Sequence, residues 1–183
     1  MKTFNLIPPA KPSTGRTRQE HGAHAEAVID KMLNHPVSGC AALGLGELRK
    51  RHTQVIIDEG QRKFKGSAGV DFTGYLKGGR ACYMEVKYTS EASLPLSIIT
   101  DTQFAEMDRA QAAGVLCVLC VVHGPSPRSP LSRVSVLPWS VVQQAMAQHQ
   151  TRISREVLTA YYLPLSTPLL KARAFTDVLE VKS

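Results

Sequence analysis

Two acidic residues and a lysine stand in this sequence at a spacing that could support phosphate chemistry. Glu85 and Lys87 are separated by a single residue, and Asp71 precedes them across a glycine-containing turn. Because side chains alternate along a strand, Glu85 and Lys87 project from one face, and Asp71 on a partner strand can meet Glu85 there. Two carboxylates beside one point form a site for a hard divalent cation such as Mg²⁺, which can deliver a bound water as a nucleophile. Lys87 would orient that water or offset the negative charge that develops at phosphorus.

A plain structural explanation fits the same three residues. In a surface hairpin, Glu85 and Lys87 would be solvated and Asp71 would cap the turn. Their positions along the strands do not decide between the two interpretations. The order Asp, spacer, Glu-x-Lys is the signature of the PD-(D/E)xK nuclease superfamily, but its spacer varies so widely that further residues must agree.

The hairpin that would carry these residues is the clearest element of the sequence. Residues 69–89 contain two strand-like runs, and residues 77–79 between them include two glycines, which accept positive φ in a tight turn. Apolar periodicity predicts helices over residues 19–33, 98–113 and 140–149, and strands over residues 115–122 and 134–137. A strand, a helix and a strand in that order indicate an α/β fold, with a mixed central sheet flanked by helices.

Two basic segments accompany these elements. Residues 1–18 combine prolines, glycine and basic residues with almost no apolar periodicity, so we expect a flexible basic N-terminal arm before a single domain over residues 19–183. Residues 40–57 are apolar and then strongly basic, which favours a strand or a hairpin arm.

The composition limits the class of protein. At 183 residues and 43% hydrophobic, the chain can bury one sizeable core, which excludes disordered and fibrous classes. A formal net charge of +7 favours an anionic partner, with nucleic acid first among the candidates. No apolar run is long enough for a membrane span, and the first residues lack the apolar stretch of a signal peptide. We therefore expect a cytoplasmic protein that does not bind membranes.

The cysteines give no firm metal site. Cys117 and Cys120 have C-x-x-C spacing, but they lie in an apolar run whose alternation would place them on opposite faces of a strand. No second ligand pair stands at the spacing of a zinc finger. We interpret the four cysteines as core thiols.

Further sequence blocks agree with the nuclease signature, and together they resemble the RecU-type Holliday junction resolvases, a dimeric branch of the PD-(D/E)xK nucleases. The similarity spans most of the chain. Its blocks are Phe64-Lys65, Asp71-Phe72-Thr73-Gly74, Gly79-Arg80, Glu85-Val86-Lys87-Tyr88-Thr89, Leu94-Pro95-Leu96 and Gln103. The segment Arg152-Ile-Ser-Arg-Glu-Val-Leu158, with Tyr161 and Leu163, is similar to the basic C-terminal segment of that family.

The resemblance implies a restriction-endonuclease-like core and a role for each matching residue. It implies that Asp71 and Glu85 bind Mg²⁺ or Mn²⁺ and that Lys87 is the catalytic lysine. Glu26 is similar to the family's helical glutamate, which completes or supports the metal site. Gln103 takes the polar position of the following helix near the active site, although an exposed glutamine on an amphipathic helix is equally compatible with the sequence.

The resemblance also implies the partner and the reaction. A homodimer would cut a four-way DNA junction by paired symmetric nicks during recombination and repair, because a two-fold axis places two identical sites on matching strands. Between Asp108 and Asp177 the only acid is Glu156, which favours a surface that binds the backbone of duplex DNA. The candidate DNA-binding residues are Arg49, Lys50, Arg51, Arg62, Lys63, Lys65, Arg80, Arg152 and Arg155.

The chain departs from the family pattern between its first helix and Phe64, where the family's proline-rich patch is missing. The departure bears on the stalk that enters a junction, and the basic residues at 49–51 and 62–65 could supply a protrusion instead. Two alternatives therefore stay open. One is a nuclease of the same superfamily that acts on linear or flapped duplex, and the other is a catalytically idle module that binds junctions or duplex DNA.

Overall fold

A computed structural model describes residues 15–37, 39–51, 55–58, 61–64, 69–124 and 133–163. Its centre is a five-stranded sheet in the order β1-β4-β5-β7-β8. The strands are β1 (Gly46–Lys50), β4 (Phe72–Leu76), β5 (Ala81–Thr89), β7 (Leu116–His123) and β8 (Arg133–Pro138). β5 and β7 run parallel, whereas the other neighbouring pairs are antiparallel. The sheet is therefore mixed, and the predicted α/β class is confirmed at this level.

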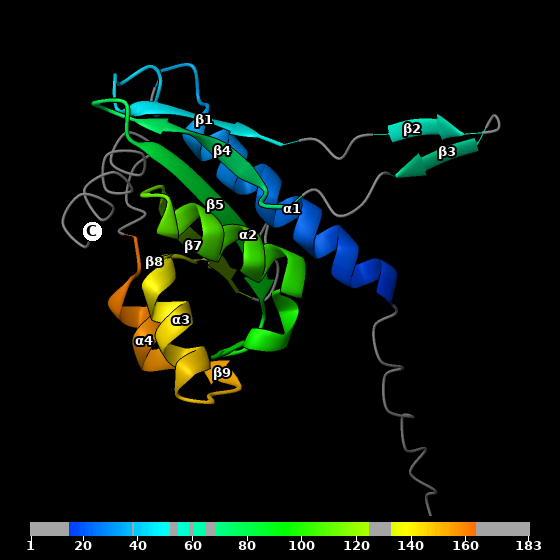
Figure 1. Cartoon of the computed structure of the whole chain (residues 1–183), viewed down its shortest axis with the longest axis vertical. Helices are drawn as coiled ribbons and strands as arrows, with labels where there is room; N and C mark the ends of the chain where they lie inside the picture. Colours follow the sequence, from blue (N-terminus) through cyan, green and yellow to red (C-terminus); the bar gives the residue numbers. More distant parts are fainter. Residues whose placement is uncertain are drawn as a thin grey trace, which may run out of the picture.

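Helices cover both faces of this sheet (Figure 1). The helix α1 (Gly15–Leu33) presents Ala25, Ile29 and Leu33, one turn apart, to a core that includes Met84 and Val86 of β5. The second core lies under α2 (Asp101–Ala112), α3 (Trp139–Ala147) and α4 (Arg155–Ala160). The two cores use alternate residues of the central strands, because successive side chains of a strand project to opposite faces.

The strand β7 explains the apolar run that the sequence shows at residues 115–122. All eight of its residues are buried, since the strand lies between β5 and β8 and is covered by a core on each face. Cys117 belongs to the core under α2 and α3, and Cys120 to the core under α1. All four cysteines are buried free thiols, which confirms their interpretation as core residues.

Several elements begin at other residues than the sequence pattern predicts. α1 starts at Gly15, within the segment that we expected to be an arm, and residues 1–14 of that expected arm lie outside the described part of the chain. α2 starts at Asp101, because Leu96–Ile98 forms a short 3-10 helix and Thr100 then caps the α-helix. Gly114, at φ +84°, ends this helix as predicted.

Residues 40–57, which we expected to form a strand or a hairpin arm, contribute instead to two strands that belong to different sheets. β1 is the edge of the central sheet, whereas β2 (Val55–Asp58) pairs with β3 (Gln61–Phe64) in a separate two-stranded sheet. Figure 1 shows β2 and β3 standing apart from the central sheet. A third small sheet joins β6 (Leu94–Pro95) to β9 (Arg152–Ile153). Within the described residues, no helix is long and apolar enough to cross a membrane.

Candidate active site

The hairpin of β4 and β5 brings Asp71 beside Glu85. Phe72 is the register partner of Met84, so Asp71, one residue before β4, stands across from Glu85. The side-chain oxygen Oδ2 of Asp71 accepts a hydrogen bond of 2.8 Å from the backbone N–H of Val86. The tight turn at the other end of the hairpin uses Gly78 and Gly79, both at positive φ. The predicted hairpin is confirmed, and its register sets the two carboxylates together.

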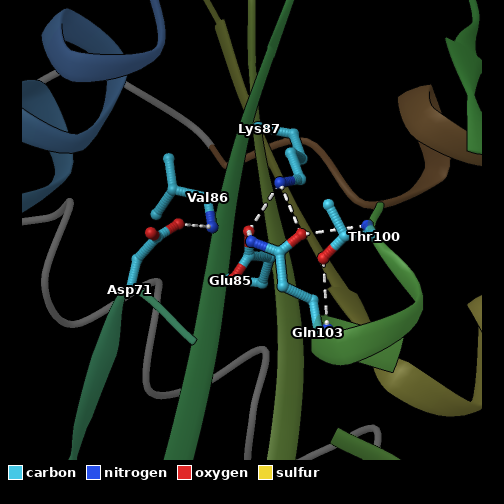
Figure 2. A network of polar contacts seen from close by, with 6 residues as sticks. All are labelled: Asp71, Glu85, Val86, Lys87, Thr100 and Gln103. Carbon is cyan, nitrogen blue, oxygen red and sulfur yellow. Dashed lines mark hydrogen bonds and ion pairs between the residues drawn. The ribbon is translucent and has the colours of Figure 1, made fainter. Parts of the chain in front are cut away.

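Glu85 is completely buried, and its contacts are shown in Figure 2. Lys87 Nζ lies 2.6 Å from Glu85 Oε1, and Gln103 Nε2 donates to the same oxygen over 2.5 Å. Lys87 Nζ also donates to Gln103 Oε1 over 3.0 Å. Val86, between the two charged residues, is buried in the opposite core. The alternation expected from a strand is therefore observed, whereas the solvated surface hairpin is not.

The start of α2 holds Gln103 in this position. Thr100 Oγ1 accepts a hydrogen bond from the backbone N–H of Gln103, and Gln103 Oε1 accepts one from the backbone N–H of Thr100. This reciprocal pair is a capping box, in which two backbone donors at a helix start are satisfied by side chains. The amide of Gln103 thus serves the helix cap with its oxygen and Glu85 with its nitrogen. Sequence reasoning missed Thr100, although the T-x-x-Q pattern before a helix would have indicated it.

The two carboxylates lie in an environment that disfavours their negative charges. Burial raises the pKa of Glu85, the negative charge of Asp71 raises it further, and Lys87 opposes both effects. Burial also raises the pKa of Asp71, against the hydrogen bond from Val86, with a smaller upward contribution from Glu26. Glu85 Oε2 is buried and has no hydrogen-bond partner. A cation bound at this position would offset two unfavourable terms. One is the burial of an oxygen without a partner, and the other is the repulsion between the two carboxylates.

The donor set fits a hard divalent ion. Carboxylate oxygens are the ligands that Mg²⁺ and Mn²⁺ prefer, and Mg²⁺ keeps several waters, so two carboxylates can be enough. Among the residues with described side chains, no group of three or more His, Cys, Asp and Glu is placed to hold a metal. The structure thus brings together two candidate ligands, Asp71 and Glu85.

Glu26 lies close to the site but has another partner. It projects from α1, and its Oε2 is 2.8 Å from Lys50 Nζ at the end of β1. Its charge nevertheless acts on the pKa of Asp71. The structure therefore places the predicted third carboxylate in an ion pair with Lys50, and it is not grouped with Asp71 and Glu85 as a third ligand among the described residues.

The candidate DNA-binding residues fall into different groups. Arg51 Nη1 is 2.5 Å from Glu106 Oε1, and Arg152 binds Glu91 and Ser93, so both guanidinium groups already have intramolecular partners. Arg49 Nε also pairs with Glu47 Oε1, over 2.6 Å, but 79% of its side chain is accessible. Arg80 and Arg155 are exposed as well. Arg62 and Lys63 belong to β3, where only the backbone is described, and Lys65 lies outside the described residues.

Neither a scan against protein-family models nor a search of curated proteins finds a match for this chain.

Proposed function

We propose that this chain is a metal-dependent endonuclease with a restriction-endonuclease-like core, which hydrolyses phosphodiester bonds of branched duplex DNA. The observation that carries the proposal is the buried cluster of Asp71, Glu85, Lys87 and Gln103, in which one carboxylate oxygen has no partner. Such a cluster costs stability in a protein without a ligand, and a divalent cation would offset that cost. A catalytically idle DNA-binding module would not need a buried cluster that lowers its stability.

Each residue of the cluster has a distinct role in the proposed reaction. Asp71 and Glu85 would hold Mg²⁺ or Mn²⁺, which when bound supplies an activated water and stabilises charge at phosphorus. The ammonium of Lys87, largely buried beside Glu85, would stabilise the negative charge that develops on the phosphate. Gln103 positions both Glu85 and Lys87, because its amide bonds to each of them.

The charge of the chain and its sequence resemblance support the proposed substrate class. A net charge of +7 and exposed arginines such as Arg49, Arg80 and Arg155 support binding to the phosphate backbone rather than reading of base edges. As in the RecU-type enzymes that the sequence resembles, we propose a homodimer that makes paired nicks in a four-way junction during recombination or repair. The free buried thiols are compatible with the cytoplasm of a bacterial or phage-infected cell.

The test is a cleavage assay on two matched substrates. A labelled four-way junction and a linear duplex of the same sequence are incubated with the protein, with Mg²⁺ or with EDTA, and resolved on a denaturing gel. Symmetric paired nicks in the junction alone, lost in EDTA, are expected. Equal cutting of both substrates would instead show a general duplex nuclease. Binding without any cut, with Mg²⁺ and with Mn²⁺, would contradict the enzymatic proposal.

A further inference from the structure

Three residues form one row that crosses the sheet at the candidate active site. Asp71 stands across from Glu85 on β5. On its other side, the backbone N–H of Arg51, the residue after β1, donates to the carbonyl oxygen of Asp71 over 2.8 Å. Asp71 is therefore the middle member of the row. Because neighbouring strands are about 5 Å apart, both Arg51 and Glu85 lie one strand spacing from Asp71.

The helix α2 contacts both ends of this row. Gln103 donates to Glu85, and Glu106, three residues later, pairs with the guanidinium group of Arg51 over 2.5 Å. Residues three apart lie on the same side of a helix, so one side of α2 makes both contacts. The ion pair at the Arg51 end is partly shielded from water, since only 21% of the Glu106 side chain is exposed.

The carboxylate of Glu106 occupies the space that a side chain at residue 69 would need. Gly69, two residues before Asp71, is buried, and a Cβ atom on it would lie 1.3 Å from Glu106 Oε2 and 2.3 Å from its Cδ. Gly69 does not have a positive φ, so space and not backbone conformation requires a glycine here. The segment of residues 69–71 therefore lies against Glu106 at its start and is bonded to Arg51 at its end.

We propose that Glu106 is a positioning residue for the metal site. Together with Arg51, and in the space that Gly69 leaves, it fixes the segment that carries Asp71, so that the Asp71 carboxylate stays opposite Glu85. This inference rests on the proposed function. It assigns the Arg51 side chain, a candidate DNA contact from the sequence, a role inside the fold. Metal affinity is then the property that the ion pair controls.

The carboxylate of Asp71 needs such support because its neighbour repels it. Asp71 and Glu85 carry like charges when both are ionised, which favours their separation in the metal-free protein. The hydrogen bond from the backbone N–H of Val86 to Asp71 Oδ2 holds the carboxylate on the side of Glu85 (Figure 2). A shift of residues 69–71 would weaken this bond and move one candidate ligand away from the other. Mg²⁺ tolerates little departure from its ideal geometry, so its affinity would fall.

The metal-free protein gives the first test. Amide hydrogen exchange of Val86 is measured by NMR in EDTA for the unmodified chain, Glu106→Gln and Gly69→Ala. The amide of Met84, which pairs with Phe72 in the same ladder, is the internal reference. We expect Val86 to exchange several-fold faster in both variants while Met84 changes little, because the loosening is local. An unchanged ratio of the two exchange rates in Glu106→Gln would overturn the inference.

Mn²⁺ affinity, measured by isothermal titration calorimetry, gives the second test. We expect Glu106→Gln and Gly69→Ala each to bind Mn²⁺ about tenfold more weakly, as for the loss of groups that orient metal ligands. In a Glu106→Ala background, Gly69→Ala should cause no further loss, because the shorter side chain leaves room for the added methyl group. A second loss of equal size in that background would overturn the inference.

A matched ion pair of the same strand provides the control. Glu47 pairs with Arg49 over 2.6 Å near the other end of β1 from Arg51. Glu47→Gln also removes the acidic partner of an arginine, and we expect little change in Mn²⁺ affinity or in Val86 exchange. An equal loss of affinity in Glu47→Gln would assign the effect to net charge and overturn the inference.

The two proposals fail in different ways. If the unmodified chain binds Mn²⁺ and Glu106→Gln binds it equally well, only the positioning role of Glu106 is wrong. If the unmodified chain binds no Mn²⁺, with or without a DNA duplex, the proposed function fails. The exchange of Val86 in EDTA then still decides whether Glu106 positions Asp71, because that measurement needs no metal.

Discussion

Gln103 Nε2 and Glu85 Oε1 are joined by a 2.5 Å hydrogen bond between the start of α2 and the middle of β5. Lys87 uses the same oxygen of Glu85, at 2.6 Å, and leaves Oε2 without a partner. Both donors therefore bond to Oε1 of the carboxylate, and Oε2 is left available for another ligand. A helix cap and the proposed active site are thus built from the same amide group.

Removal of either carboxylate should abolish cleavage and spare DNA binding. For Asp71→Asn and Glu85→Gln we expect a loss of at least about 100-fold in the cleavage rate, because the positions that would hold the metal are lost. DNA affinity should change little, since lysine and arginine contacts to phosphates supply it. Single-turnover cleavage and gel-shift titrations measure the two quantities. Loss of DNA binding in a variant that melts like the unmodified chain would contradict this division of roles.

Lys87→Met should impair turnover while metal binding is retained. The substitution keeps the length of the apolar stem and removes the charge that lies beside Glu85. We expect the cleavage rate to fall by about 100-fold, as for the loss of one group that stabilises a transition state. Mn²⁺ titration provides the independent measurement. An unchanged cleavage rate would be incompatible with a catalytic Lys87.

The capping box should matter for both stability and rate. Thr100→Ala removes a side chain that caps α2, and we expect it to lower the free energy of unfolding by about 1 kcal/mol. Gln103→Ala removes the same box and also the bonds to Glu85 and Lys87. Its cleavage rate should therefore fall about tenfold below that of Thr100→Ala. Denaturant unfolding and single-turnover kinetics test this, and equal rates for the two variants would refute the positioning role.

The buried carboxylates should make the metal-free protein less stable as the pH rises. The pKa of Glu85 is raised in the fold, whereas in the unfolded chain this carboxyl ionises near pH 4. Above that pH the Glu85 carboxyl ionises more readily in the unfolded chain than in the folded chain, so the free energy of unfolding falls. In EDTA we expect Glu85→Gln to be more stable than the unmodified chain by about 1 kcal/mol at pH 7, with no gain below about pH 4. Thermal melts across this range measure the difference, and a variant that is less stable at pH 7 would disprove the cost of this charge.

His123 should give the opposite dependence on pH. Its Nε2 is 2.8 Å from Ser135 Oγ, which donates its own proton to the carbonyl oxygen of Leu158, so the imidazole donates to Ser135. Burial lowers the pKa of His123 to about 4, below its ordinary value of 6.5. As the pH falls from the ordinary pKa of histidine toward the lowered one, His123 binds a proton in the unfolded chain but not in the folded one. The free energy of unfolding therefore falls by about 2 kcal/mol.

The variant His123→Gln should remove this acid-dependent loss, because Gln can donate a hydrogen bond but does not titrate. His149, which is exposed, provides the control. We expect His149→Gln to keep the slope of stability against pH between 6.5 and 4, measured by urea unfolding. A slope that survives in His123→Gln would assign the effect to other groups.

The sequence was sufficient for features set by local patterns. Alternation along residues 81–89 predicted that Glu85 and Lys87 share a face while Val86 is buried on the other, and the structure has this arrangement. The glycines at 78 and 79 predicted the turn, and the turn fixes the register that brings Asp71 beside Glu85. The apolar run at 115–122 predicted a buried strand, and its alternation placed Cys117 and Cys120 in different cores. These features follow from the period of a strand and from the backbone freedom of glycine.

Only the tertiary structure decided which side chains are partners. Lys50 and Glu26, or Arg51 and Glu106, are far apart in the chain, and no local pattern distinguishes a lysine that binds DNA from one that neutralises a glutamate. The same holds for Gln103, whose helical spacing fits an exposed surface as well as a buried contact with Glu85. The pairings depend on strand order and on which helix covers which face. Strand order and helix placement are set by the packing of the whole core, whereas the periodicity of each element depends on its local sequence alone.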